Sequence, residues 1–251
     1  MTMLRRLTLA LILLAVSSST HLLAATPAEA LRGAADRGSP ALLLVTDPAN
    51  QNLGTARSTV IDAAKRAEGC VTVELDRSDA ANAELVTKYR LAEAPTPLIL
   101  VFAGNGAFAG GVPSAQATPS QVAEMFPTPK KAELLQAVQS GNAVLLVASR
   151  KSMRDQPKVV ESCALACGQT KGKSVTVQVD LDDSTEARFL RELRIDAATE
   201  TPVTLVVNHQ GQITGSFNGP VEVATLVQAA TKKAGGCCPK GSDKGCAKPQ
   251  A

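Results

Sequence analysis

The chain has 251 residues, which is enough for one large domain or two of ordinary size. Hydrophobic residues make up 45% and charged residues 20%, a balance typical of globular proteins that excludes disorder for the bulk of the chain. With no Trp, one Tyr, five Phe and a formal net charge of +3, the composition excludes aromatic stacking grooves and gives no electrostatic footprint for nucleic acid. We therefore expect no nucleic-acid partner.

The N-terminal 25 residues are typical of a secretory signal peptide. Arg5 and Arg6 precede an apolar run over residues 7–16, and small residues follow. The run is too short to span a bilayer, so we predict cleavage after Ala24 or Ala25 and no stable membrane span afterwards. An uncleaved anchor is the alternative. The expected location is periplasmic or secreted, where disulfides can persist.

The rest of the chain repeats itself. Residues 71–76, Val-Thr-Val-Glu-Leu-Asp, return at 175–180 as Val-Thr-Val-Gln-Val-Asp. A helical pattern follows each segment and leads to Thr-Pro and an apolar run, first after Pro97 and again after Pro202. Self-similarity at a fixed spacing indicates a structural repeat.

Both copies also begin alike, with Thr26 and Thr128 each followed by proline, the pattern of a helix N-cap with proline in the first turn, and Glu29 predicts a capping box in the first copy. We predict a first domain at 26–127, a second at 128–236 and a flexible tail at 237–251. In each domain the expected order is helix, strand, helix, strand, helix, strand, hairpin, strand and helix, with a crossover helix near residues 55–68 in the first.

This order, with a proline at the start of the third strand, resembles the thioredoxin fold. The predicted class is therefore α/β: two tandem thioredoxin-like domains, each with a mixed central sheet and helices on both faces. The resemblance implies that cis peptide bonds precede both Pro97 and Pro202.

The sequence departs from the thioredoxin pattern where the chemistry matters. Thioredoxins carry Cys-x-x-Cys after the first strand, where a helix N-terminus stabilises the thiolate. The corresponding residues, 46–52 and 148–153, contain no cysteine. Ordinary disulfide exchange at that position is excluded, so no catalytic residue is assigned there. Whether the protein is an enzyme stays open.

Two cysteines lie elsewhere in the second copy. Cys163 and Cys167 are four residues apart on the expected crossover helix, on one stripe with Val159 and Val160. We expect this stripe to pack on the sheet, with the cysteines acting as small buried apolar residues. A relocated redox pair or two metal ligands is the alternative. Cys70, at the edge of a strand, is expected to have no special role.

The last three cysteines, Cys237, Cys238 and Cys246, lie in a tail rich in Gly, Lys and Pro. They favour disulfide or thiol redox chemistry, and three thiolates could also bind Cu or Zn. Neither Cys-x-x-Cys spacing nor a nearby His supports a full tetrahedral site, so no cofactor is assigned.

The interpretation that accounts for most of these features is a redox-inactive binding or scaffold protein that recognises a protein or peptide. Thioredoxin-like domains without the dithiol often bind peptides, and the resemblance implies that possibility here. The groove would include Thr96, Pro97, Thr201 and Pro202, with the two threonines offering main-chain groups to an extended segment. Two alternatives remain: a redox protein that uses Cys163 and Cys167 or the tail, and a soft-metal binder that uses the tail.

Overall fold

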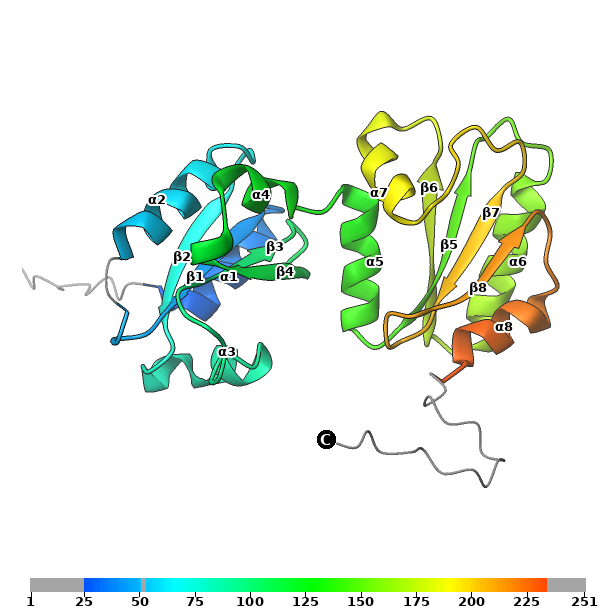
Figure 1. The fold of residues 1–251 in the computed structure, drawn as a ribbon. Helices are drawn as coiled ribbons and strands as arrows, with labels where there is room; N and C mark the ends of the chain where they lie inside the picture. Colours follow the sequence, from blue (N-terminus) through cyan, green and yellow to red (C-terminus); the bar gives the residue numbers. More distant parts are fainter. Residues whose placement is uncertain (1–24, 51–52, 234–251) are drawn as a thin grey trace, which may run out of the picture.

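The computed structural model describes residues 25–50 and 53–233. Two four-stranded sheets with helices on both faces follow one another along this part of the chain (Figure 1). Each has the element order that the sequence predicts. Most of the predicted signal peptide and the cysteine-containing tail lie outside the described residues. Among the described helices, none combines the length and the hydropathy that crossing a membrane requires.

The first copy runs from the first helix to a short closing helix before the junction. Its elements are α1 (Pro27–Asp36), β1 (Ala41–Thr46), α2 (Leu53–Ala64), β2 (Val71–Asp76), η1 (Ala80–Asn82), α3 (Ala83–Lys88), β3 (Leu98–Phe102), β4 (Phe108–Pro113), η2 (Ser114–Gln116) and α4 (Pro119–Glu124).

The second copy has the same elements apart from the short 3-10 turn before the closing helix. They are α5 (Pro129–Gln139), β5 (Ala143–Ser149), α6 (Gln156–Gln169), β6 (Ser174–Asp180), η3 (Ser184–Glu186), α7 (Ala187–Glu192), β7 (Val203–Val207), β8 (Ile213–Asn218) and α8 (Val223–Thr231).

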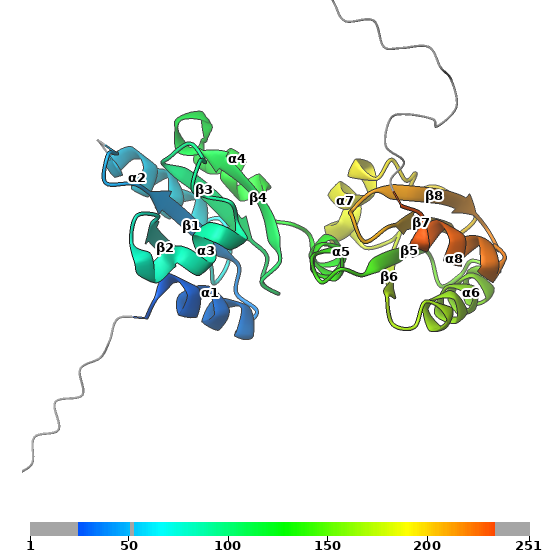
Figure 2. The ribbon, with the colours of Figure 1, turned by 90° about the horizontal axis from the view of Figure 1, so that it is seen from below.

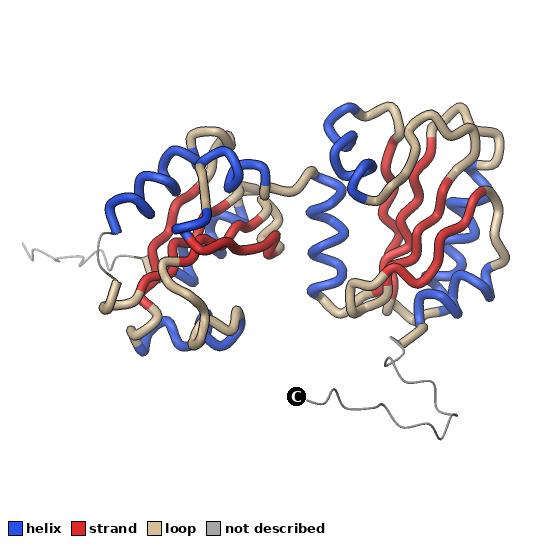
Figure 3. The backbone as a smooth tube through the Cα atoms, in the orientation of Figure 1, coloured by secondary structure: helices blue, strands red, loops and turns tan. Residues whose placement is uncertain are grey.

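The two sheets, whose strands are red in Figure 3, have the same strand order, β2-β1-β3-β4 in the first copy and β6-β5-β7-β8 in the second. The first strand of each copy is central: β1 pairs parallel with β2 and antiparallel with β3, and β5 pairs likewise with β6 and β7. Every residue of β1 and β5 is buried. That burial explains why both strands are continuous apolar runs rather than alternating patterns.

Each sheet is covered on both faces. One face of the first sheet packs against α1 and α3, and the other against α2 and α4. The second sheet packs likewise against α5 and α7 on one face and α6 and α8 on the other. Aliphatic side chains dominate all four clusters, and burying one Leu or Val contributes roughly 1.5–3 kcal/mol relative to leaving it exposed. The low aromatic content is therefore compatible with two complete cores.

The two helices that open the copies are capped differently. Thr26 forms the predicted capping box with Glu29: its Oγ1 accepts the Glu29 N–H at 3.3 Å, and Glu29 Oε2 accepts the Thr26 N–H at 2.8 Å. Thr128 also precedes its helix, but its hydroxyl makes no capping bond. The buried carboxylate of Glu186 replaces it, because Glu186 Oε1 accepts the N–H of Lys130 at 2.8 Å.

Two sequence expectations need correction. The peptide bond between Thr96 and Pro97 is cis, but the bond before Pro202 is not, so the expectation of two cis bonds is wrong for the second copy. A local turn accompanies that difference, since the Thr199 hydroxyl bonds both main-chain groups of Thr201. The crossover helix of the first copy also ends at Ala64, several residues earlier than expected.

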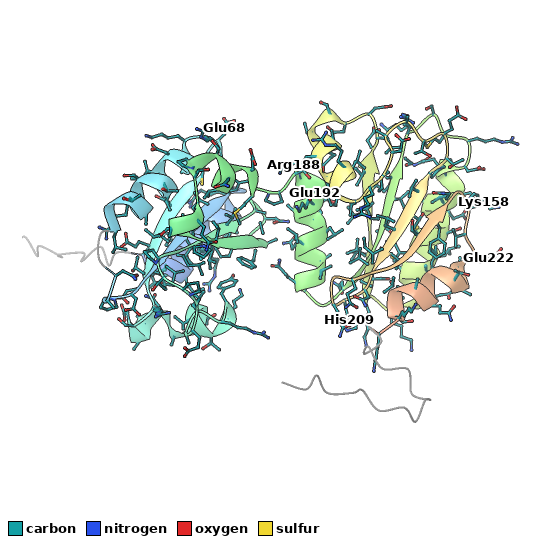
Figure 4. All side chains as sticks on the ribbon, in the orientation of Figure 1. Glu68, Lys158, Arg188, Glu192, His209 and Glu222 are labelled. Carbon is teal, nitrogen blue, oxygen red and sulfur yellow. The ribbon has the colours of Figure 1, made fainter. Side chains whose placement is uncertain are left out.

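The copies contact each other through α5, which lies beside β4 in both ribbon views (Figures 1 and 2). Gln139 on α5 bonds both main-chain groups of Phe108, with its Oε1 accepting the N–H at 3.0 Å and its Nε2 donating to the carbonyl at 2.7 Å. Arg188 reaches the junction from α7 and donates to the carbonyls of Glu124 and Phe126 (Figure 4). These hydrogen bonds join side chains to main chain, and a small apolar cluster of Ala103, Ala107 and Ala132 also spans the contact.

Candidate functional site

The loop that follows β1, where thioredoxins keep their dithiol, is held by an ion pair. The carboxylate of Asp47 accepts the Nε–H of Arg77 at 2.7 Å, and the two side chains come from the ends of the parallel strands β1 and β2. Asp47 also accepts the N–H of Ala49 at 2.9 Å. That main-chain bond, together with Arg77, lowers the pKa of the Asp47 carboxyl below its ordinary value. Asp47 is thus an anion committed to structure.

Arg77 extends this network to the loop in front of β3. Its second nitrogen, Nη1, donates to the carbonyls of Leu91 and Ala94 at 3.3 and 2.8 Å. A planar guanidinium can make these bonds together because its donors point in fixed, divergent directions. The arginine therefore fixes the approach to Pro97 from one side.

Asn50 fixes the same loop from the other side. Its Nδ2 lies 3.2 Å from both the carbonyl oxygen and the hydroxyl of Thr96, and its Oδ1 accepts the N–H of Asp47 at 2.8 Å. The carboxamide of Asn50 thus joins the loop after β1 to Thr96, the residue before Pro97. The N–H of Thr96 has no hydrogen-bond partner among the described residues.

The second copy builds the same connection with the charges interchanged. Arg150 follows β5 at the position of Asp47, and its Nε donates to Asp182, just after β6, at 2.7 Å. Arg150 also donates to the carbonyls of Ala197 and, at 2.8 Å, Thr199. In both copies an arginine therefore ties the two strand ends to the loop before the third strand.

The proline loop of the second copy is nevertheless closed differently. The Thr199 hydroxyl accepts the N–H of Thr201 at 3.4 Å and donates to its carbonyl at 3.1 Å. Pro202 is buried, whereas Pro97 is only partly buried. The four residues expected to form a binding groove thus lie at equivalent sheet ends, but the two threonines differ in which main-chain groups are already bonded.

Cys163 and Cys167 lie where the sequence predicts, on the face of α6 that packs on the second sheet. Cys163 is fully buried, and burial raises the pKa of its thiol to about 11, with a further contribution from Cys167. With its pKa raised in this way, the Cys163 thiol stays protonated at neutral pH. Cys167 is partly buried, and its Sγ lies 3.4 Å from the hydroxyl of Thr176.

Cys70 is a third free thiol, partly buried at the start of β2, and burial raises its pKa to about 11 as well. No cluster of three or more His, Cys, Asp or Glu side chains that could hold a metal ion is found within residues 25–50 and 53–233. The alternative metal ligands Cys237, Cys238 and Cys246 lie outside this part of the chain. His209, in the β7–β8 turn, is solvent-exposed (Figure 4).

Sequence reasoning named the prolines and threonines of this region but missed Asn50, Arg77 and Arg150. A signal for the ion pairs was present, because a charged residue follows the first strand of each copy and one of opposite charge follows its parallel neighbour. Strand exits commonly carry polar residues of many kinds, so the pairing became visible only with the register of the strands.

No protein-family model and no curated protein matches this chain. Among solved structures, the N-terminal domain of alkylhydroperoxide reductase AhpF from Enterococcus faecalis is 14% identical, with 80% of this chain and 96% of that one covered and a TM-score of 0.28. The first two thioredoxin domains of Saccharomyces cerevisiae Eps1p are 10% identical, with 84% and 97% covered and a TM-score of 0.30. Zinc-bound human ERp44 is also 10% identical, with 79% and 56% covered and a TM-score of 0.34.

These likenesses concern the fold alone. The sheet order, the strand directions and the helices on each face define the architecture independently. The described chain consists of two thioredoxin-like domains in tandem.

Proposed function

We propose that the protein is a redox-inactive thioredoxin-like scaffold, exported to the periplasm or secreted, that binds polypeptide partners. The observation that carries this proposal is an ion pair at the end of the first strand of each copy, β1 and β5. Asp47 and Arg150 lie at the position at which a thioredoxin keeps its reactive sulfur, and each is paired with a charged residue that follows the neighbouring parallel strand, Arg77 or Asp182. A nucleophile needs a stabilised thiolate, and these positions supply structural charges instead.

The thiols of the described residues support the same reading. Cys163 and Cys70 have pKa values raised to about 11 by burial, the opposite of the change that activates a thiol for exchange. Cys167 lies one helical turn from Cys163, and the Cβ atoms of residues so spaced in a helix are roughly 5–6 Å apart. A disulfide needs about 3.8 Å, so closing one would distort α6.

Binding of a polypeptide is proposed for the loop ends that carry Thr96 and Pro97, and their counterparts Thr201 and Pro202. Main-chain groups at the end of a sheet can pair with an extended segment whatever its side chains are. The N–H of Thr96, which has no hydrogen-bond partner within residues 25–50 and 53–233, is such a group. The two arginine networks would hold the loops in place without contributing chemistry.

The test combines a binding measurement with a redox measurement on the full chain purified from its export compartment. The binding probe is reduced, carboxymethylated α-lactalbumin, a permanently unfolded polypeptide that carries a fluorescent label. Fluorescence anisotropy should give saturable binding, and reduction of insulin by dithiothreitol should run no faster with the protein than without it. Absence of binding to this probe contradicts the scaffold proposal.

Two variants separate the alternatives. A triple substitution of Cys237, Cys238 and Cys246 by serine removes the tail thiols, and a double substitution of Cys163 and Cys167 by alanine removes the helix thiols. Insulin reduction that either variant abolishes favours a redox protein. Stoichiometric Cu or Zn in the purified protein, lost with the tail cysteines, favours a metal binder. The mass of the purified N-terminal peptide checks export, since cleavage after Ala24 or Ala25 fixes its length.

A further inference from the structure

A groove at the junction of the two domains takes its walls from both of them. Its volume is about 670 Å³, within the range of roughly 300–1,000 Å³ that is typical of ligand pockets, which often lie between domains. The first domain supplies the end of α1, the loop before β2, the β3–β4 turn and the segment after α4, and the second supplies the first turn of α5. This junction groove therefore requires the tandem chain.

Apolar side chains make up most of the lining of the junction groove. Alanines leave space between the walls, and a phenylalanine and prolines make the walls firm. The lining includes Ala35, Ala67, Ala103, Phe126, Pro127 and Ala132. An apolar side chain that enters the groove is removed from water, and the gain grows with the apolar area that is buried.

The charged residues that line the groove are both acidic, Asp36 and Glu133. Asp36 is the last residue of α1, is exposed and has no ion-pair partner among the described residues. The carbonyl end of a helix carries a partial negative charge, which adds to that of the carboxylate. Glu133 pairs with Lys130 at 2.7 Å, but this pair is partly exposed and a competing cation can replace it. The groove therefore favours a positively charged partner.

Hydrogen bonds between the domains hold the walls of the groove in place. Asn105, in the β3–β4 turn, donates from Nδ2 to the carbonyl of Ala132 on α5 at 2.9 Å. Arg188, labelled at the junction in Figure 4, donates to the carbonyl of Phe126. These contacts fix residues that line the groove on both sides. A groove that is formed before binding lowers the conformational cost of taking up a ligand.

We propose that the junction groove binds a polypeptide partner through a short segment in which large apolar side chains lie next to Lys or Arg. The apolar side chains fill the groove, and the cation pairs with Asp36. This inference rests on the proposed function and adds to it a second binding surface of different chemistry. The proline loops offer main-chain groups, whereas the junction groove selects side chains.

The competing occupant is the C-terminal tail of the same chain. Residues 234–251 contain Lys240, Lys244 and Lys248 against a single acid, Asp243. They contain no Val, Leu, Ile, Met or aromatic residue. The tail thus supplies the charge that the groove favours but not the large apolar side chains, so a separate polypeptide fits it better.

The test measures binding of short peptides to the full chain by fluorescence anisotropy. The probe is a fluorescein-labelled peptide, Ser-Gly-Lys-Leu-Phe-Arg-Gly-Ser. One control peptide replaces its Lys and Arg by Glu, and the other replaces its Leu and Phe by Ala. The probe should bind about tenfold more tightly than either control, because each control removes one of the two interactions.

Three variants locate the site. Ala67→Phe fills the groove from a loop outside both apolar cores and should weaken probe binding about tenfold or more. Asp36→Asn should weaken it about two- to fivefold at low salt and have no effect at about 1 M salt. Asp62→Asn, which removes an exposed carboxylate of the same domain outside the groove, should change nothing. Amide chemical shifts that move on addition of the probe should centre on Ala67, Asn105 and Ala132.

The outcomes separate the groove from the proposed function. If labelled α-lactalbumin binds but the probe does not, or if Ala67→Phe binds the probe as the wild type does, the groove proposal is wrong and the scaffold function stands. Equal binding of the probe and the Glu control also overturns it. If replacing Lys240, Lys244 and Lys248 by alanine strengthens probe binding more than tenfold, the tail is the occupant instead. If neither polypeptide binds, both proposals are wrong.

Discussion

Gln139 pairs its side-chain amide with the main chain of Phe108 as a neighbouring strand would, accepting from the N–H and donating to the carbonyl. β4 is an edge strand of the first sheet, and unpaired edge groups are open to association with other chains. One side chain of the second domain thus covers the start of that edge. The same bond pair is one of the contacts between the two domains, beside those of Arg188.

Gln139→Ala should therefore loosen the domain contact without unfolding either domain. The amide of Phe108 should exchange with solvent about three- to tenfold faster, since an exposed neutral hydrogen bond contributes about 1 kcal/mol. Gln139→Glu keeps the acceptor for the N–H but loses the donor, so it should give a smaller increase. Hydrogen exchange followed by NMR measures both. Equal exchange in the wild type and both variants would show that the contact is not formed in solution.

The hydrogen bonds of Arg77 predict a larger loss of stability than the Gln139 contact does. Arg77→Met leaves the carbonyls of Leu91 and Ala94 without their donor, and we expect the free energy of unfolding of the first domain to fall by about 2 kcal/mol. Tyr89 is the only tyrosine and the chain has no Trp, so tyrosine fluorescence during urea unfolding reports on the first domain alone. Arg57→Met is the control.

Arg57 also forms an ion pair with a neighbouring strand, bonding Glu74 at 2.7 Å, but both side chains are largely exposed. Exposed pairs contribute about 0–1 kcal/mol, so this variant should unfold almost as the wild type does. If Arg77→Met lowers the free energy of unfolding no more than Arg57→Met does, the loop before Pro97 does not depend on Arg77.

The sequence predicted the repeat, the element order and the burial of the central strands because these follow from periodicity and composition. It also predicted the capping box of Thr26, whose partners lie within four residues. It could not predict the cap of α5, since Glu186 comes from a distant turn and reaches Lys130 only in the folded chain. Local patterns are readable where the partners are close in sequence, and long-range polar contacts are not.

The candidate site follows the same rule. Thr96 and Pro97 could be named from a motif, whereas the role of Asn50 depends on two contacts, one three residues away and one forty-six residues away. The equivalence of Thr201 to Thr96 was inferred from identical residues in identical positions. The two threonines do lie at equivalent sheet ends, but their main-chain bonding differs because the neighbours differ: Met153 stands in place of the Asn50 amide, and the Thr199 hydroxyl bonds Thr201.

The buried cap makes a separate prediction about the second domain. Glu186→Ala removes a buried carboxylate that accepts the N–H of Lys130, the first free N–H of α5. We expect the free energy of unfolding of the second domain to fall by about 2 kcal/mol, which is in the range for hydrogen bonds to charged groups. Thr128→Val should cost much less, because its hydroxyl has no partner among the described residues. Amide exchange of the β5 strand measures the stability of this domain. If Thr128→Val lowers the free energy of unfolding as much as Glu186→Ala does, Glu186 does not cap α5 in place of Thr128.

Burial of the thiols predicts how stability depends on pH. The pKa of Cys163 in the folded protein is raised to about 11, whereas an exposed thiol titrates near about 8.5. Between these values the folded state binds more protons than the unfolded state, so stability falls as pH rises. The contribution of the buried thiol to stability is complete below about pH 8.5, falls as pH rises towards about 11, and is lost above that value.

The pKa of Cys70 is also raised to about 11, and lysines begin to titrate in the same pH range. The pH dependence of the wild type alone therefore cannot isolate the contribution of Cys163. The comparison needs Cys163→Ala, Cys70→Ala and the double variant, each unfolded in urea at about pH 7.5 and about pH 10. The loss of stability between the two pH values should be smaller in each single variant and smallest in the double one. A thiol that was already ionised in the folded protein, as a redox-active cysteine would be, predicts the reverse: its replacement would leave the loss unchanged or increase it.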